Sequence, residues 1–187
     1  PADGTLFVSN SMPIRDLDAF LASDARPLRV LGQRGASGID GLVSGAAGAS
    51  AADQGPVMLF TGDLAVLHDA GGLLAARDHA LSLVVLVVQN DGGGIFSFLP
   101  IAEQGSSVDF ERLFRTPHGL DLSGLAHFYE VGFKRIEDRE TLKRDLRQSL
   151  SAPGVHLIEV PVDRDANLES FREAIALASS VARRELK

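Results

Sequence analysis

The chain has 187 residues, 45% of them hydrophobic and 23% charged, which fits one globular α/β domain over residues 1–187 with a sizeable core. A formal net charge of −7 argues against a nucleic-acid partner, and the lack of cysteine excludes a disulfide framework and a thiolate metal site. The longest apolar run, Leu83 to Val88, is too short to span a bilayer and no signal peptide is recognised, so we expect no integral membrane span and a cytoplasmic location.

The first predicted strand, residues 5–8, begins within five residues of the start of the chain, which lacks an initial Met. We therefore expect a piece of a longer protein, with any N-terminal targeting segment outside it. A helix is predicted over about residues 14–21, with Ser11 as its N-cap and Pro13 tolerated in its first turn.

Two arginines follow the first two predicted strands, residues 5–8 and 28–31. Arg15 sits near a helix start, where a carboxylate would be favoured over a cation. It either pairs with Asp16, Asp18 or solvent, or reaches over the sheet edge towards an anionic ligand. Arg34 lies in the glycine-rich turn of residues 32–41, and a tight connection alone does not explain a cation at this edge.

The central unit of the chain consists of a strand, an acidic turn, a helix, a second strand and a glycine turn. Residues 56–60 and 81–88 are short apolar runs typical of strands buried on both faces, with a helix predicted over residues 64–79. Parallel strands joined by a crossover helix end at the same sheet edge. Asp63 and Asn90, 27 positions apart, should therefore meet where ligands of open α/β sheets bind.

The residues at that edge offer hard oxygen ligands. The Asp63 carboxylate, the Asn90 amide oxygen and a glycine-loop carbonyl suit Mg²⁺, and the N–H groups of residues 92–94 are expected to hold phosphate oxygens. The structural alternative is that Asp63 is a helix N-cap and residues 90–92 form an ordinary turn. Neither a lysine-containing phosphate loop nor G-x-G-x-x-G is present.

The C-terminal half alternates helices and strands. Residues 95–99 are apolar and form either core or the wall of a pocket. His118, in a Pro-His-Gly turn, is predicted to be a surface residue, and His156 a sheet residue. A surface loop is expected at 104–108, helices at 109–114, 121–129, 139–150 and 167–186, and strands at 132–136 and 155–160.

Gly-Asp-Leu, then Asn 27 residues after the Asp, then Gly-Gly, resembles the cofactor motif of the thiamine-diphosphate decarboxylase and synthase superfamily. The resemblance implies a three-layer α/β/α fold with a mostly parallel sheet, and Asp63, Asn90 and the Gly92 carbonyl as ligands of Mg²⁺ or Mn²⁺. The residues implied to bind thiamine diphosphate are Ser37, Ile39, Gly62, Asp63, Leu64, Ala65, Asn90, Gly92, Gly93, Ile95 and Phe96.

Longer stretches are similar to one branch of that superfamily, the 2-succinyl-5-enolpyruvyl-6-hydroxy-3-cyclohexene-1-carboxylate (SEPHCHC) synthases of menaquinone biosynthesis. The stretches are residues 9–16, 34–41, 67–69 and 90–100. Ile39 would be the apolar prop under the bent cofactor. Departures from the family at Gln33 and Ala65 put single polar contacts in doubt, whereas Gln89, a third departure, is not expected to be a ligand. The substrate-binding residues implied are Ser11, Arg15, Arg34, Ile95, Phe96 and Leu99.

This branch decarboxylates 2-oxoglutarate and adds the succinyl-semialdehyde carbanion to isochorismate, so the resemblance implies a transferase. The chain would be its diphosphate-binding part. The activating Glu is expected on the pyrimidine-binding domain of a second subunit, in a homodimer or homotetramer, so no catalytic residue is assigned here and the isolated chain should be inactive. The alternatives are a domain of another thiamine-diphosphate enzyme, acetolactate-synthase-like or a 2-oxo acid decarboxylase, and a non-catalytic phosphate- or nucleotide-binding module.

Overall fold

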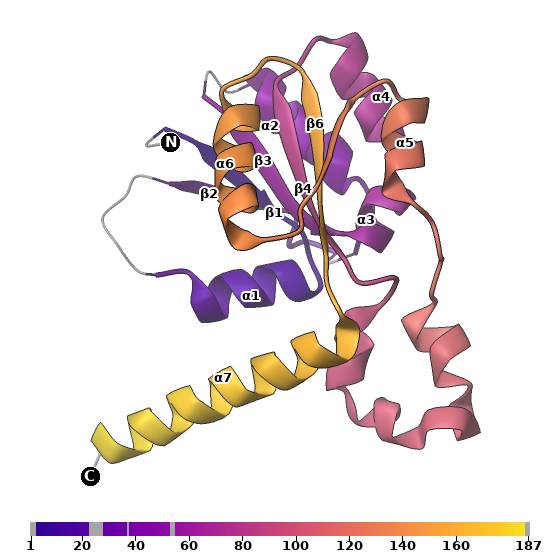
Figure 1. The fold of residues 1–187 in the computed structure, drawn as a ribbon, viewed down its shortest axis with the longest axis vertical. Coiled ribbons are helices and arrows are strands. Elements are labelled where there is room, and N and C mark those ends of the chain that lie inside the picture. The colour runs from indigo at the N-terminus through magenta and orange to yellow at the C-terminus, as the bar shows by residue number, and fades with distance from the viewer. Residues whose placement is uncertain (1–2, 23–27, 37, 53–54, 186–187) are drawn as a thin grey trace.

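The computed structural model describes residues 3–22, 28–36, 38–52 and 55–185. Six strands form one sheet in the order β2-β1-β3-β4-β6-β5, every strand pair being parallel, and helices cover both faces (Figure 1). The three-layer α/β architecture predicted from the sequence is confirmed.

The strands follow the short apolar runs of the sequence, within one or two residues of the predicted bounds. The central strand β4 is buried along most of its length, which explains its unbroken apolar sequence, whereas the edge strand β2 is exposed. The strands are β1 (Thr5–Val8), β2 (Arg29–Gly32), β3 (Val57–Gly62), β4 (Leu83–Gln89), β5 (Gly132–Arg135) and β6 (Val155–Pro161).

The strand order places the loops after β1, β3 and β4 together. The chain passes from β1 to β2 on one side and then returns to β3 on the other, so the direction of winding reverses between β1 and β3. The register pairs Gly62 with Val88, so Asp63 and Asn90 emerge side by side at the carboxyl edge of β3 and β4. The sequence predicts this placement, because parallel strands joined by a crossover helix end at the same edge of the sheet.

Helices α2 to α5 pack on one face of the sheet and α6 packs on the other. The first layer contributes Leu42, Val66, Leu73 and Leu122 to the main core. The second layer buries Leu142, Leu146 and Leu150 of α6 against β3, β4 and β6. The helices are α1 (Met12–Phe20), α2 (Leu42–Ala52), α3 (Asp63–His68), α4 (Gly71–Asp78), α5 (Leu122–Phe128), α6 (Arg139–Leu150) and α7 (Arg164–Glu185).

The single helix predicted over residues 64–79 is wrong, because the segment is divided into α3 and α4. At the break, the Asp69 carboxylate accepts hydrogen bonds from the backbone N–H of Ser44 at 2.7 Å and from its hydroxyl at 2.9 Å. Asp69 thus satisfies a backbone donor in the first turn of α2. A Cβ at Gly72 would lie 2.7 Å from the same Ser44 nitrogen, so α4 could not approach α2 this closely with any other residue.

Residues 94–115 form short helical turns: 3-10 turns over Gly94–Phe98 and Pro100–Val108, the second kinked at Gly105, and a π-helical turn over Glu111–Arg115. The surface loop predicted over residues 104–108 is therefore this kink and the 3-10 turn after it, and it is largely exposed as expected. Phe114 holds this segment together, since its ring packs edge-on against Phe96 and stacks on Phe110.

Helix α7 begins three residues earlier than predicted and runs away from the sheet below α1 (Figure 1). Phe171 anchors it, with ring centroids 5.5 Å from Phe20 and 5.1 Å from Phe98. Of the helices in the described ranges, none is both long and apolar enough to cross a membrane.

Candidate cofactor and substrate site

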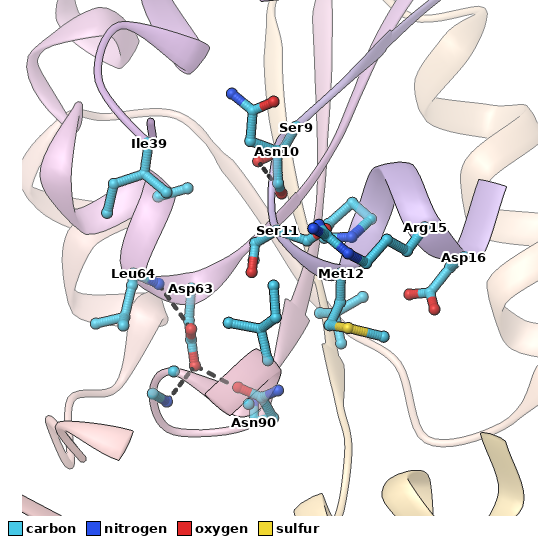
Figure 2. A pocket seen from close by; sticks show the side chains of 18 of the residues that line it. Ser9, Asn10, Ser11, Met12, Arg15, Asp16, Ile39, Asp63, Leu64 and Asn90 are labelled. Carbon is cyan, nitrogen blue, oxygen red and sulfur yellow. Dashed lines mark hydrogen bonds between the residues drawn. The ribbon is translucent and has the colours of Figure 1, made fainter. Parts of the chain in front are cut away.

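A cavity of about 500 Å³ opens at the carboxyl edge of β1, β3 and β4 (Figure 2). Its volume is in the range of small-molecule and cofactor sites. It brings together all but two of the predicted site residues: Ser11, Arg15, Arg34, Ile39, Gly62, Asp63, Leu64, Ala65, Asn90, Gly92, Gly93, Ile95 and Phe96.

Asp63 is buried, with 2% of its surface exposed, and is held by backbone donors from two loops. Its Oδ1 accepts from the N–H of Leu64 at 2.7 Å, and its Oδ2 accepts from the N–H of Asn90 at 3.2 Å and of Gly92 at 3.0 Å (Figure 2). The N-cap position of α3 belongs to Gly62, so capping does not account for this side chain. Asp63 instead joins the β3 loop to the β4 loop.

The glycine loop does not present the free N–H groups that the sequence predicts. The N–H of Gly92 donates to Asp63, that of Gly93 to the Arg115 carbonyl at 2.7 Å, and that of Gly94 to the Gly92 carbonyl at 3.0 Å. The expectation that these three groups hold phosphate oxygens is therefore wrong. All three N–H groups already donate hydrogen bonds within the protein. The loop therefore offers carbonyl and amide oxygens to a ligand rather than a nest of free N–H groups.

The shape of this loop requires glycine. Gly92 has φ +133°, and a Cβ there would lie 2.1 Å from the Arg115 carbonyl oxygen. A Cβ at Gly93 would lie 2.6 Å from the Phe114 carbonyl oxygen. The backbone of residues 114–116 therefore packs directly on the metal-binding candidate loop and fixes its position.

Asn10, which was not singled out from the sequence, organises the opposite side of the cavity. It is 2% exposed, and its Nδ2 donates to the carbonyls of Gln33 at 2.9 Å and Gly38 at 2.6 Å. Its Oδ1 accepts from Nη1 of Arg34. Asn10 therefore ties the loop after β1 to the loop after β2 and orients Arg34. Its only signal in the sequence is its place within the Ser9-to-Asp16 motif.

Ser11 and Arg15 lie at the start of α1 and line the cavity (Figure 2). Ser11 has φ +69°, a backbone conformation that is costly for a residue with a side chain and that is often found at functional sites. Arg15 Nη1 donates to the Ser11 carbonyl at 2.6 Å instead of forming the surface ion pair considered from the sequence. Burial raises the pKa of the neighbouring Asp16 carboxyl, which also lines the cavity.

The remaining predicted residues divide into three groups. Ile39, Ile95 and Phe96 are half-buried and form apolar parts of the cavity wall. Of the two alternatives for residues 95 and 96, core or pocket wall, the structure therefore supports the pocket wall. Leu99 is 46% exposed and lies outside the cavity lining. Ser37 lies outside the described residues.

The prediction that His118 is a surface residue is wrong. Its side chain is 10% exposed, and its Nε2 lies 3.3 Å from Oδ2 of Asp63. Its turn is held by Asp91, whose carboxylate accepts from the N–H of Gly119 at 2.7 Å and of His118 at 3.0 Å; these hydrogen bonds lower the pKa of Asp91. A lone His in a turn gives no sign in the sequence of a partner more than fifty positions away.

Arg164 and Asn167 at the start of α7 also line the cavity and were not identified from the sequence. They follow β6, whose parallel pairing with β4 brings the next loop to the same edge. The N–H of Val162 donates to the Gln89 carbonyl at 2.8 Å, which fixes this approach. Gln89, one of the departures from the family pattern, accepts from the N–H of Asp91 at 2.9 Å and so has a structural role.

The donor set around Asp63 fits a hard divalent cation. Within the described residues, no group of three or more His, Cys, Asp and Glu side chains is placed to hold a metal ion. What the edge offers is one buried carboxylate whose Oδ1 has a single backbone partner, one amide and the backbone carbonyls of a glycine loop. Mg²⁺ accepts such an incomplete set of oxygens because it usually keeps water and substrate phosphates as further ligands.

Comparisons with known proteins identify relatives in sequence and a solved structure of the same fold. A SEPHCHC synthase of Myxococcus xanthus is 51% identical over 94% of this chain, and one of Chloroflexus aurantiacus is 49% identical over 96%. The chain spans about 30% of the length of each. The crystal structure of benzoylformate decarboxylase from Polynucleobacter necessarius superposes with a TM-score of 0.71 at 20% identity, covering 88% of this chain and 31% of that one, which shows a common fold.

The predicted resemblance to SEPHCHC synthases is thus confirmed at the level of sequence. Residues 18–160 match the family described as thiamine pyrophosphate enzyme, C-terminal TPP binding domain. The match includes β3, β4 and the glycine loop, which carry Asp63, Asn90 and Gly92. The chain belongs to the family of C-terminal thiamine-pyrophosphate-binding domains of thiamine pyrophosphate enzymes.

Proposed function

We propose that this chain is the diphosphate-binding part of a SEPHCHC synthase, a transferase that decarboxylates 2-oxoglutarate and adds the remaining unit to isochorismate. The observation that carries the proposal is that one cavity joins a hard-oxygen corner, around Asp63, to two arginines, Arg15 and Arg34. Two relatives that are 51% and 49% identical to this chain bear this name, and the chain corresponds to about 30% of the length of each.

In this proposal Asp63, the Asn90 amide oxygen and the Gly92 carbonyl hold Mg²⁺ or Mn²⁺, and the metal anchors the diphosphate. Thiamine diphosphate, when bound, supplies the electron sink that decarboxylation needs. The residues of this chain would hold the metal and the cofactor in position. Buried Asp63 is fixed by three backbone donors, and Ile39 presents an apolar surface against which the cofactor would bend.

Arg15 and Arg34 are the proposed anchors for substrate carboxylates. A guanidinium pairs with a carboxylate through two parallel hydrogen bonds, and both proposed substrates carry carboxylates. Asn10 holds Arg34 at the cavity, and the Arg15 side chain is folded back on the Ser11 carbonyl. Ser11, with its unusual backbone conformation, and the Ile95 and Phe96 walls complete the substrate side.

The activating Glu would come from the pyrimidine-binding domain of a second subunit, in a homodimer or homotetramer. None of the cavity-lining residues in the described part of the chain is a Glu. The site would therefore be completed by another domain, which agrees with the 30% share of the relatives that the chain spans. Location in the cytoplasm is part of the same proposal.

The test uses the full-length enzyme that contains this chain, with thiamine diphosphate, Mg²⁺ and 2-oxoglutarate, and follows the loss of isochorismate. The proposal predicts a cofactor-dependent loss that Arg34→Ala slows strongly at substrate concentrations near the wild-type KM. CO₂ release from another 2-oxo acid without consumption of isochorismate would instead support an acetolactate-synthase-like enzyme or a decarboxylase. Preference for a nucleotide over thiamine diphosphate would support a phosphate-binding module without catalysis.

A further inference from the structure

His118 is a largely buried titratable side chain beside Asp63 for which the proposed function has no role. The turn that carries it is attached to the glycine loop by the Asp91 carboxylate, which accepts from two of its backbone N–H groups. The preceding residues pack on the same loop, where the N–H of Gly93 donates to the Arg115 carbonyl. The segment 114–119 is therefore a continuous support under the residues proposed to bind the metal.

The hydrogen bonds of the imidazole define which nitrogen carries the proton. Nδ1 accepts from the backbone N–H of Leu120 at 3.0 Å, so in the neutral ring the hydrogen is on Nε2. Nε2 is buried and has no hydrogen-bond partner in the described part of the chain. It lies 3.3 Å from Oδ2 of Asp63, a contact at ion-pair distance that does not meet the geometry of a hydrogen bond.

An unsatisfied buried N–H is costly, and a neighbouring carboxylate is its natural partner. Oδ2 of Asp63 already accepts from the N–H groups of Asn90 and Gly92, on the side of the carboxylate that faces the glycine loop. A third donor on that oxygen would hold the carboxylate plane and leave Oδ1, with its single backbone partner, turned towards a cation. Residues behind metal ligands commonly act in this way.

We propose that His118 is a positioning residue for the metal site: its Nε2–H holds the Asp63 carboxylate in the orientation that binds Mg²⁺. The inference rests on the proposed metal site and adds a residue that touches neither metal nor substrate. It also gives a function to the Pro-His-Gly turn, which attaches the 114–119 segment to both loops of the site.

The test compares two amide replacements in the full-length enzyme. The amide nitrogen of His118→Gln can reach the position of Nε2, whereas that of His118→Asn reaches only the position of Nδ1. Isothermal titration calorimetry measures Mg²⁺ affinity at saturating thiamine diphosphate, and thermal unfolding without Mg²⁺ measures stability. His127→Asn, on the exposed side of α5, is the matched histidine control.

We expect His118→Asn to weaken Mg²⁺ binding by about 10- to 100-fold. His118→Gln should restore most of that loss, and His127→Asn should bind like the wild type. Wild-type affinity in His118→Asn would overturn the inference, as would an equal loss in both amide variants that follows their loss of stability. Failure of the wild type itself to bind thiamine diphosphate in an Mg²⁺-dependent manner would overturn the metal site, and the inference with it.

Discussion

The two sides of the cavity are built in different ways. On the β3–β4 side, buried Asp63 accepts three backbone hydrogen bonds, and the glycine loop is packed against residues 114–116. On the β1–β2 side, Arg15 in the first turn of α1 donates to the Ser11 carbonyl, and Arg34 in the loop after the exposed strand β2 donates to the Asn10 side chain. The first side is fixed by the backbone, and the second depends on side-chain contacts.

This difference has a functional reading. A proposed metal and diphosphate site benefits from a rigid frame, because its ligands must be held close to a fixed geometry. A proposed carboxylate site benefits from long cationic side chains, because these adapt to the substrate. Changes on the two sides should therefore have separable effects, on cofactor affinity and on substrate affinity.

The largest effect should come from Asp63→Asn, which keeps the shape of the side chain but removes its charge. Removing one partner of a buried charge interaction costs about 3–5 kcal/mol, which corresponds to more than a 100-fold loss of affinity. Calorimetry on the full-length enzyme should show that Mg²⁺-dependent binding of thiamine diphosphate is lost. Retention of wild-type affinity would place the metal elsewhere.

Gly92→Ala should disrupt the same side through the backbone. The residue has φ +133°, and the new methyl group would collide with the Arg115 carbonyl. We expect the free energy of unfolding to fall by about 3 kcal/mol, together with weaker cofactor binding. In the matched control Gly48→Ala, within α2, the methyl group meets no atom within 4 Å and should stabilise the helix by up to about 1 kcal/mol.

Arg34→Ala tests the other side. Hydrogen bonds to charged groups contribute about 1.5–3 kcal/mol, so KM for the carboxylate substrate should rise about 10- to 100-fold. Affinity for thiamine diphosphate and Mg²⁺ should stay unchanged, as should all parameters in Arg147→Ala, which removes an exposed charge from α6. Equal losses of substrate and cofactor affinity would contradict the separation of the two sides.

The smallest effect should come from Asp138→Ala, at the N-terminus of α6 and outside the cavity lining. Hydrogen bonds from the N–H and hydroxyl of Thr141 and from the N–H of Glu140 lower the pKa of Asp138. A carboxyl whose pKa is lowered in the folded state stabilises the fold at pH values above the usual Asp pKa of about 3.9. This stabilisation is lost as the pH falls through the folded-state pKa.

Unfolding experiments should therefore show Asp138→Ala slightly less stable than the wild type at pH 7, with the difference shrinking below about pH 4. Cofactor affinity should not change. A difference in stability that persists at pH 2 would mean that the carboxylate acts through something other than these hydrogen bonds.

The sequence predicted what depends on strand order and spacing. The placement of Asp63 and Asn90 follows from two apolar runs and a crossover helix, and the structure pairs the two strands as expected. It did not predict the hydrogen bonds made by the glycine-loop N–H groups, the burial of His118 or the break at Asp69. Apart from the local bond from the Gly94 N–H to the Gly92 carbonyl, each of these depends on a contact between residues more than twenty positions apart, which local pattern does not encode.

Anomalous diffraction from crystals of the full-length enzyme grown with thiamine diphosphate and Mn²⁺ tests the central claim most directly. The account predicts a manganese peak bonded to the Asp63 carboxylate, the Asn90 amide oxygen and the Gly92 carbonyl, at the short distances typical of hard divalent cations, about 2.0–2.2 Å. A manganese peak on the diphosphate but away from these three residues would contradict it.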